Sequence, residues 1–214
     1  MYVPKGYRPQ DPAWAIDAVR SNPLAVLVSS GDGSPYATHL PVILDTSTLD
    51  AGTGETGLEG VTFLGHLNRQ NPHWNHLASG QRALLIFQGP HSYITPSVYE
   101  VSPAAPTWNF VSVHAQGSLE VIDDPAGTLD IIKATVAAYE SDFGSDWDMT
   151  HSLDYFDELL PGVGAFRLKA DSVQGMFKLS QEKTPEVRSR VVHALDASGS
   201  TAKQTLAATM RDYT

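Results

Sequence analysis

The sequence predicts a mainly β protein with some α structure, a β-barrel decorated by short helices. Runs of β-branched and aromatic residues follow one another and are separated by Gly- and Pro-rich turns, as in antiparallel sheets. Short helical segments interrupt these runs, and their order does not match the regular alternation of a parallel α/β sheet. Neither a G-x-G-x-x-G nor a P-loop pattern occurs.

Composition limits the classes of function. The 214 residues, 42% of them hydrophobic, are enough for one core. We expect a domain over 1–195 and a C-terminal helical extension over 196–214. The formal charge of −10 disfavours direct nucleic-acid binding. Absence of cysteine excludes disulfides, thiolate metal sites and a Cys nucleophile. Without a leader-like start or a long apolar run, a soluble cytoplasmic protein with no membrane contact is expected.

The first elements follow from local patterns. Residues 11–23 predict a helix that Asp11 caps, with Ala13, Ile16 and Val19 at helical spacing on one face. The apolar run 24–30, the turn 31–35 and the run 36–45 predict a hairpin. The small, polar, Gly-rich residues 46–60 predict a mobile loop.

The later elements continue this order. Strands are expected over 61–67, 81–89 with a continuation into 91–96, and 107–123, the last broken only at Gly117. A short helix lies between the first two, over 68–80, and helices follow over 123–141 and 152–161. In the longer helix, one face is predicted to hold Leu129, Ile132, Val136 and Tyr139. Residues 162–181 predict a strand pair, and 184–214 one or two surface helices.

Asn68 and Arg69 lie where a predicted strand ends and a predicted helix begins, so they are candidates for a phosphate-binding site. The alternative is a solvated arginine beside an ordinary capping asparagine. His66, His73 and His76 match no standard zinc spacing, and no metal site is predicted; such histidines more often hydrogen-bond backbone or water.

The run from Trp108 to His114 mixes aromatic and polar residues. In a strand, Trp108, Phe110 and His114 share one face, whereas Asn109 shares the other with Val111, Val113 and Ala115. The first face suits a planar heteroaromatic ligand, which needs ring contacts and a few donors. A half-exposed strand that packs under a helix explains the same pattern.

Several stretches, taken together, carry a resemblance that covers about residues 1 to 190. They are 1–12, "THLPVILD", "GHLNRQNPHW", "IFQGPHSYITPSVY", "PTWNFVSVHAQG" and "KLSQ". In this order they resemble PaiB-like proteins, described as FMN-binding negative transcriptional regulators. Departures from the family pattern fall at Val98, Phe110, Phe177 and Glu182.

The resemblance implies a split β-barrel of the pyridoxamine phosphate oxidase type, a homodimer, and FMN between the subunits. It implies that Asn68 and Arg69 hold the phosphate and that the segment Thr38, His39, Leu40 runs along the flavin ring. Further ring contacts implied by the resemblance are Gln88 and Lys178 of the KLSQ motif, together with Trp108, Asn109 and His114, which would come either from the other subunit or from the barrel rim.

Three functions are compatible with these residues. The first is an FMN-dependent oxidoreductase that acts on a small molecule. The second is a PaiB-like negative transcriptional regulator, although no helix-turn-helix with a basic recognition helix is evident in 184–214. The third is a split-barrel protein that binds haem or a deazaflavin.

Overall fold

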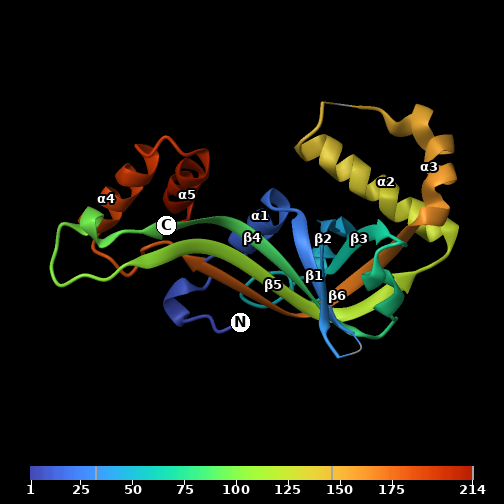
Figure 1. Ribbon diagram of the computed structural model, residues 1–214, viewed down its shortest axis with the longest axis horizontal. Helices are drawn as coiled ribbons and strands as arrows, with labels where there is room; N and C mark the ends of the chain where they lie inside the picture. Colours follow the sequence, from blue (N-terminus) through green and yellow to red (C-terminus); the bar gives the residue numbers. More distant parts are fainter. Residues whose placement is uncertain (32, 146, 214) are drawn as a thin grey trace.

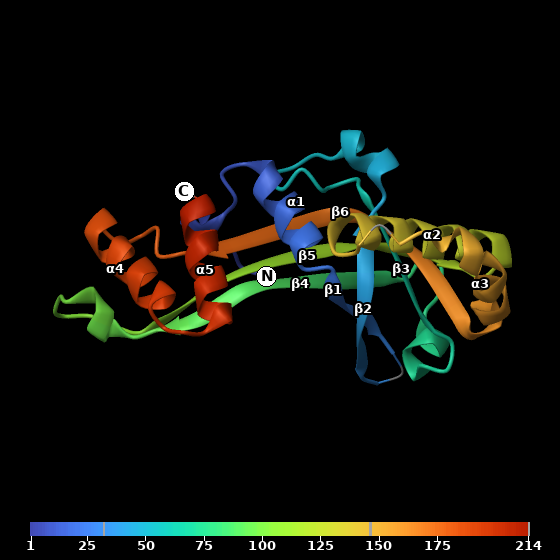
Figure 2. The same cartoon turned by 90° about the horizontal axis from the view of Figure 1, so that it is seen from above.

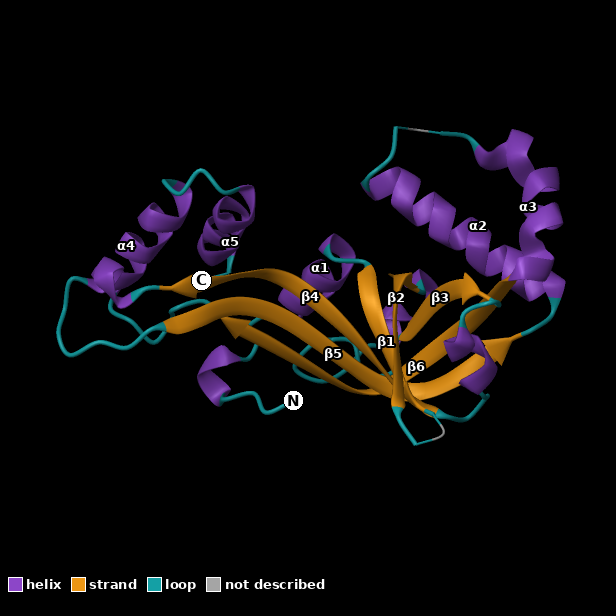
Figure 3. Ribbon diagram, in the orientation of Figure 1, coloured by secondary structure: helices purple, strands orange, loops and turns teal. Residues whose placement is uncertain are grey.

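The computed structural model describes residues 1–31, 33–145 and 147–213. Within them six antiparallel strands close into a barrel in the order β1-β2-β3-β6-β5-β4 (Figure 1 and Figure 3). The strands are β1 Leu24–Ser30, β2 Pro35–Leu44, β3 Thr62–Asn68, β4 Arg82–Ile94, β5 Thr107–Ile122 and β6 Val163–Lys178. The mainly β barrel predicted from the sequence is confirmed.

Helices cover the barrel and its extension. They are α1 Pro12–Ser21, α2 Pro125–Asp142, α3 Leu153–Leu159, α4 Pro185–Asp196 and α5 Thr201–Asp212. Short 3-10 segments include η2 Thr46–Ala51, η3 Pro72–His76 and η4 Pro96–Tyr99. Helices α2 and α3 lie at one end of the molecule and α4 and α5 at the other (Figure 1). No helix in the described part of the chain is long and apolar enough to cross a membrane.

The molecule is elongated because three of its strands are longer than the others. β4, β5 and β6 contain 13, 16 and 16 residues, against seven in β1 and in β3. These three strands continue past the barrel as a curved ribbon, and α5 lies across it (Figure 2).

The core follows the alternation of each strand. Leu27, Leu40, Phe63, Phe87 and Phe166 are at most 2% exposed and fill the interior. The predicted hairpin is present, with β1 and β2 paired from Leu24↔Pro41 to Ser30↔Pro35. Asp32 of its turn lies outside the described residues. In the predicted loop 46–60, η2 forms a short 3-10 helix and Leu58 is fully buried, so the core anchors this segment.

The prediction of a strand pair over 162–181 is wrong, because residues 163–178 form the single strand β6. The polar stretch around Asp171 resembles a turn. In the structure Gln116 pairs with Ser172 and Gly117 with Ala170, so Asp171 is the extra residue of a β-bulge. The predicted break of β5 at Gly117 is this same bulge.

The predicted helix faces are shifted. In α2 the buried residues are Thr128, Ile131 and Thr135, whereas Leu129, Ile132, Val136 and Tyr139 are only half-buried. In α1 they are Ala15, Ala18 and Val19, and Ala13 is exposed. The two C-terminal helices are not merely superficial, since each buries three side chains.

Candidate functional site

The barrel has a weak seam between β2 and β3. Among the described residues these strands pair only from Val42↔Gly65 to Leu44↔Phe63. Continuing that register would set His39 opposite Asn68, and both side chains are exposed. A hydrogen bond of 3.2 Å from the Asn71 amide to Thr38 Oγ1 holds the chain that follows β3 near this part of β2, so His39, Asn68 and Arg69 lie in the same region. Beyond the last pair the strands separate, and η3 follows β3 along the chain. We call this region the β2–β3 split.

A buried histidine ties η3 to the barrel at the split. His73 is 1% exposed, and its Nε2 and Nδ1 lie 2.8 Å from Ser29 Oγ and 2.9 Å from Thr38 Oγ1. The Asn71 side-chain amide donates to Thr38 Oγ1 at 3.2 Å, and Asn71 Oδ1 accepts the His73 backbone N–H. Burial lowers the pKa of His73. The Thr38 hydroxyl is thus engaged inside the protein, and mainly the backbone of this residue is left for a ligand.

The second histidine of η3 makes a similar contact. His76 Nε2 lies 2.8 Å from the Tyr36 hydroxyl, and the two rings stack with centroids 4.4 Å apart. In the described part of the chain no group of three or more His, Cys, Asp or Glu side chains could hold a metal ion. His73 and His76 both make side-chain hydrogen bonds between η3 and the barrel. Ser29 and Tyr36 were not predicted as partners of these histidines, because only the strand register places them against η3.

Arg69 is held in a defined position at the end of β3. Its Nε donates to the carbonyl of Val163 at 2.8 Å, and Nη1 lies 2.6 Å from Asp123 Oδ1. The guanidinium stacks over Trp74, 5.0 Å from the ring centroid. The side chain of Asp123 is 72% exposed, so solvent screens this ion pair. Asn68 Oδ1 accepts the backbone N–H of Gln70, and the Asn68 side chain is exposed.

The other predicted ring contacts lie on the sheet. Facing partners in register have side chains on the same side of a sheet. One row of facing residues runs from His39 on β2 through β1 and β4 to His114 on β5, and ends on β6. The next rows along the sheet contain further predicted ligand contacts. We call the side chains of these rows the outer face: His39, Val26, Ile86, His114, Gln174; Gln88, Ser112, Met176; His91, Phe110, Lys178; Tyr93, Trp108.

The outer face combines exposed aromatic rings with polar groups. Trp108 is 53% exposed, and its ring centroid lies 6.2 Å from those of His91 and Tyr93. Lys178 Nζ donates to the Thr107 hydroxyl at 2.5 Å.

Nearer the barrel the same face is partly covered. The N-terminal amine contacts Gln174, the register partner of His114. Burial, and secondarily the charge of that amine, lower the pKa of His114. Gln88 Nε2 donates to the carbonyl of Val111 at 3.1 Å. His114 therefore lies on this face beside Ile86, its register partner in β4, and the Gln88 side chain follows in the next row.

Two predicted contacts point the other way. Asn109 is fully buried, and its amide donates to Ser180 Oγ at 2.8 Å and approaches Met210 Sδ at 3.6 Å. Leu40 is 2% exposed and belongs to the core. The alternation predicted for β5 is correct, and it places Asn109 under α5 while Trp108 faces outward. The side chains of Asn109 and Leu40 therefore cannot contact a ligand on the outer face.

Two of the predicted FMN contacts, Arg69 and Lys178, lie near opposite ends of β6. Asn68 pairs with Val163 at its start, and Lys178 is its last residue. A strand of 16 residues has a contour length of about 50 Å. This is far longer than one flavin nucleotide, so Arg69 and Lys178 of a single chain cannot bind the same molecule.

Known proteins share both the sequence and the fold. A family model described as "Putative FMN-binding domain" matches residues 1–172. Protease synthase and sporulation protein PAI 2 of Bacillus subtilis is 27% identical, over 99% of this chain and 97% of that protein. The flavocytochrome Anf3 of Azotobacter vinelandii has a similar fold, with a TM-score of 0.55 at 16% identity over 78% of this chain and 67% of that one. The FAD and heme binding protein of Mycobacterium smegmatis gives 0.53 at 15% identity, over 86% and 76%.

Proposed function

Because the chain belongs to the family described as "Putative FMN-binding domain", we propose that it is a split-barrel flavoprotein that binds FMN at the β2–β3 split. This location is supported by the β2–β3 register, which ends at Val42↔Gly65 and, if continued, would set the exposed His39 level with the exposed Asn68. There the guanidinium of Arg69 lies near the part of β2 that is not paired with β3. The guanidinium suits a phosphate, and the unpaired backbone of β2 suits the polar edge of a flat ring.

The residues present fit this cofactor. Arg69 keeps its Nη2 without a hydrogen bond in the described part of the chain, and its Nη1 partner Asp123 is exposed. A phosphate dianion offers more charge and more acceptor atoms than that carboxylate, so it would compete for the guanidinium. Val26 and Ile86 provide an apolar seat in the same register row as His39.

Bound FMN would supply electron-transfer chemistry, and the protein would supply position and electrostatics. Asn68 and Arg69 would hold the phosphate. The exposed His39 would donate a hydrogen bond to the polar edge of the ring, where it favours added negative charge. We propose that the chain acts on a small molecule that approaches the open face of the ring.

A second copy of the chain would complete the site. Since Arg69 and Lys178 lie at opposite ends of β6, both can serve one flavin only if they come from different chains. The exposed aromatic rings of Trp108 and Tyr93 give the far end of the outer face the character of an interface. We therefore propose a homodimer with FMN between the subunits.

The test is the absorbance spectrum of the purified protein, with mass identification of whatever heat releases. The result expected is a flavin spectrum and the mass of FMN. A haem or deazaflavin spectrum, or a colourless protein that ignores added FMN, would reject the proposal.

The phosphate seat has its own test. Arg69→Ala should weaken FMN binding by about 1.5 to 3 kcal/mol, the value of a hydrogen bond to a charged group. Arg167→Gln is the matched control, because Arg167 is also paired with one carboxylate at the surface, Glu120. Equal FMN affinity of Arg69→Ala and Arg167→Gln would show that the phosphate lies elsewhere.

A regulatory role is the second candidate function. It is favoured by the relative from B. subtilis, whose name refers to protease synthesis and sporulation and whose match includes α4 and α5. The net charge of −10 opposes direct contact with DNA. A gel shift on the promoter region of the protein's own gene at low salt tests this role, and absence of a shift would exclude direct repression.

A further inference from the structure

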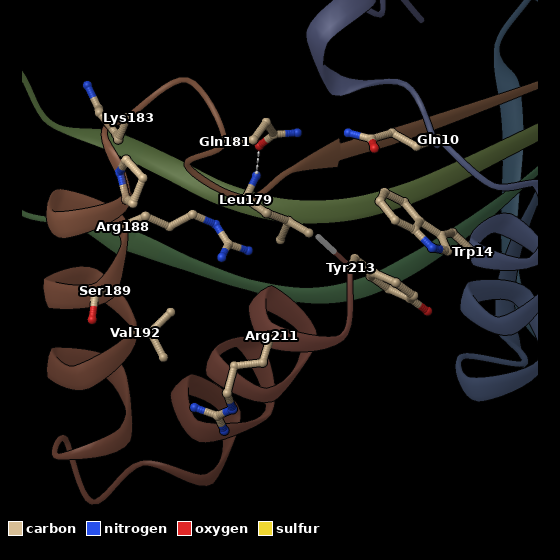
Figure 4. A pocket seen from close by; sticks show the side chains of 11 residues that line it. Gln10, Trp14, Leu179, Gln181, Lys183, Arg188, Ser189, Val192, Arg211 and Tyr213 are labelled. Carbon is tan, nitrogen blue, oxygen red and sulfur yellow. Dashed lines mark hydrogen bonds between the residues drawn. The ribbon is translucent and has the colours of Figure 1, made fainter.

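A cavity of about 540 Å³ opens between α1, α4, α5 and the segment that follows β6 (Figure 4). This volume is within the range of sites for small organic ligands, roughly 300 to 1,000 Å³. The cavity lies on the inner side of the β4–β5–β6 ribbon, where Asn109 meets Met210 of α5. Trp108 projects from the opposite side. The cavity is therefore separate from the proposed flavin seat.

The charged side chains that line this cavity are all positive, although Glu182 and Asp196 pair with two of them from outside the lining. Lys183, Arg188 and Arg211 line it, and no carboxylate does in the described part of the chain. Two of the three are already engaged. Arg211 forms an ion pair of 2.6 Å with Asp196, and Lys183 lies over the ring of Tyr99, 4.9 Å from its centroid.

Arg188 differs from these two. Its Nη2 donates to the carbonyl of Met210, and none of the described carboxylates forms an ion pair with it. The side chain is half-buried, and burial lowers its pKa. The guanidinium extends from α4 toward Leu179 and Tyr213 (Figure 4). A cation that has lost part of its water without gaining a counter-ion favours an anion from solution.

The rest of the wall is flat and apolar. The rings of Trp14 and Tyr213 lie with centroids 5.1 Å apart and an angle of 34° between their planes. Leu179 and Val192 complete this surface. Aromatic and aliphatic walls of this kind contact a planar apolar body, and the guanidinium fork matches the geometry of a carboxylate.

We propose that this cavity binds a small aromatic carboxylate, with its carboxylate on Arg188 and its ring against Trp14 and Tyr213. This site goes beyond FMN binding and does not depend on it. Most of its residues follow residue 172, where the match to the family model ends. The site is thus built largely from the segment that follows β6 and from α4, α5 and the residue after α5, with Gln10 and Trp14 contributed by the N-terminal region.

Isothermal titration of the purified protein, with any flavin it carries left in place, tests the proposal. The probes are benzoate, its neutral analogue benzamide, and phenyl phosphate. Benzoate should bind saturably and benzamide at least roughly tenfold more weakly, as expected for loss of a charged hydrogen bond. Phenyl phosphate binding better than benzoate would assign the cavity to organophosphates and overturn the choice of carboxylate.

Two variants and a control locate the site. Arg188→Gln should weaken benzoate roughly tenfold or more, whereas Arg167→Gln, on the far side of the barrel, should not change it. Ser189→Trp keeps Arg188 and fills the mouth of the cavity from an exposed position on α4, so it should abolish binding even if Arg188→Gln folds poorly. Unchanged benzoate affinity in Ser189→Trp would overturn the proposal. So would release of FMN by benzoate, which would place the anion in the flavin seat.

Discussion

Neighbouring residues of β5 allow the proposed flavin surface to be separated from the core by mutation. Asn109 and Trp108 are adjacent in sequence, and both belong to the aromatic run that suggested a flat ligand. Asn109 is fully buried under α5, and Trp108 is 53% exposed on the outer face. Asn109→Ala and Trp108→Leu should therefore affect different properties of the protein.

The magnitudes follow from the contacts. Asn109→Ala removes the hydrogen bond to Ser180, whose hydroxyl is fully buried and would lose this partner. A net hydrogen bond contributes about 1 kcal/mol, and a buried unsatisfied hydroxyl costs about 1 to 3 kcal/mol. The second figure already contains the lost bond, and the mutation also removes the buried, unpartnered Oδ1 of Asn109, so the free energy of unfolding should fall by about 1 to 3 kcal/mol. Trp108→Leu loses edge contacts with His91 and Tyr93, and should cost about 0.5 to 1.5 kcal/mol.

FMN affinity should respond in the opposite order. Trp108→Leu should weaken FMN binding several-fold, because an aromatic contact at the dimer interface is lost, and Asn109→Ala should leave it unchanged. Urea unfolding at 25 °C gives the stabilities, with unchanged m-values as the control for two-state behaviour. Flavin fluorescence titration gives the affinities. Loss of FMN from Asn109→Ala at full stability would refute the assignment of the two faces.

Three other outcomes are expected. Asp123→Asn should tighten FMN binding by about 0.5 to 1 kcal/mol in the titration, because it removes the carboxylate that competes for Arg69; weaker binding would mean that Asp123 positions Arg69. Burial lowers the pKa of His73 below its ordinary value of 6.5, so the unfolded chain binds more protons there. The free energy of unfolding should therefore reach its highest value above pH 6.5 and fall as the pH decreases through 6.5. His73→Gln should weaken this pH dependence when stability is measured by urea unfolding at several pH values. Gly117→Ala should lower the free energy of unfolding by about 1 to 3 kcal/mol, because the added Cβ would clash with the backbone of β6. Gly6→Ala should leave it unchanged, because a Cβ there would have no atom within 4 Å.

Period-two patterns predicted the strands because each has one face in the core. The same rule failed in β6, where Asp171 interrupts the alternation. The bulge gives this residue no partner in β5, and its carboxylate forms an ion pair with Arg82 at the surface. A pattern cannot distinguish an inserted residue from a turn, so two strands were predicted where one exists.

The face of α2 was predicted wrongly for a different reason. Thr128 and Thr135 are buried, and their hydroxyls donate to the carbonyls of Ile122 and Ile131. A threonine satisfied in this way behaves as an apolar residue. Hydrophobic periodicity counts it as polar and shifts the predicted face by one position.

For the candidate site, the sequence predicted which strand or strand end holds each residue, but not on which face of the sheet its side chain is exposed. Arg69 lies at the strand end where it was expected. The alternation separated Asn109 from Trp108, but it did not indicate which of the two faces was covered. That depends on α5, which is distant in sequence and packs on the ribbon through Met210. The Ser29–His73–Thr38 cluster was missed because its members meet only when η3 folds back onto the barrel.

The length of β6 has a consequence for how the cofactor is retained. If each flavin needs one end of this strand from each of two chains, cofactor and subunit association are thermodynamically linked. Dilution would then release FMN by mass action, and added FMN would favour the paired form. Retention of the yellow colour would rise with protein concentration, unlike in a flavoprotein whose whole site lies within one chain.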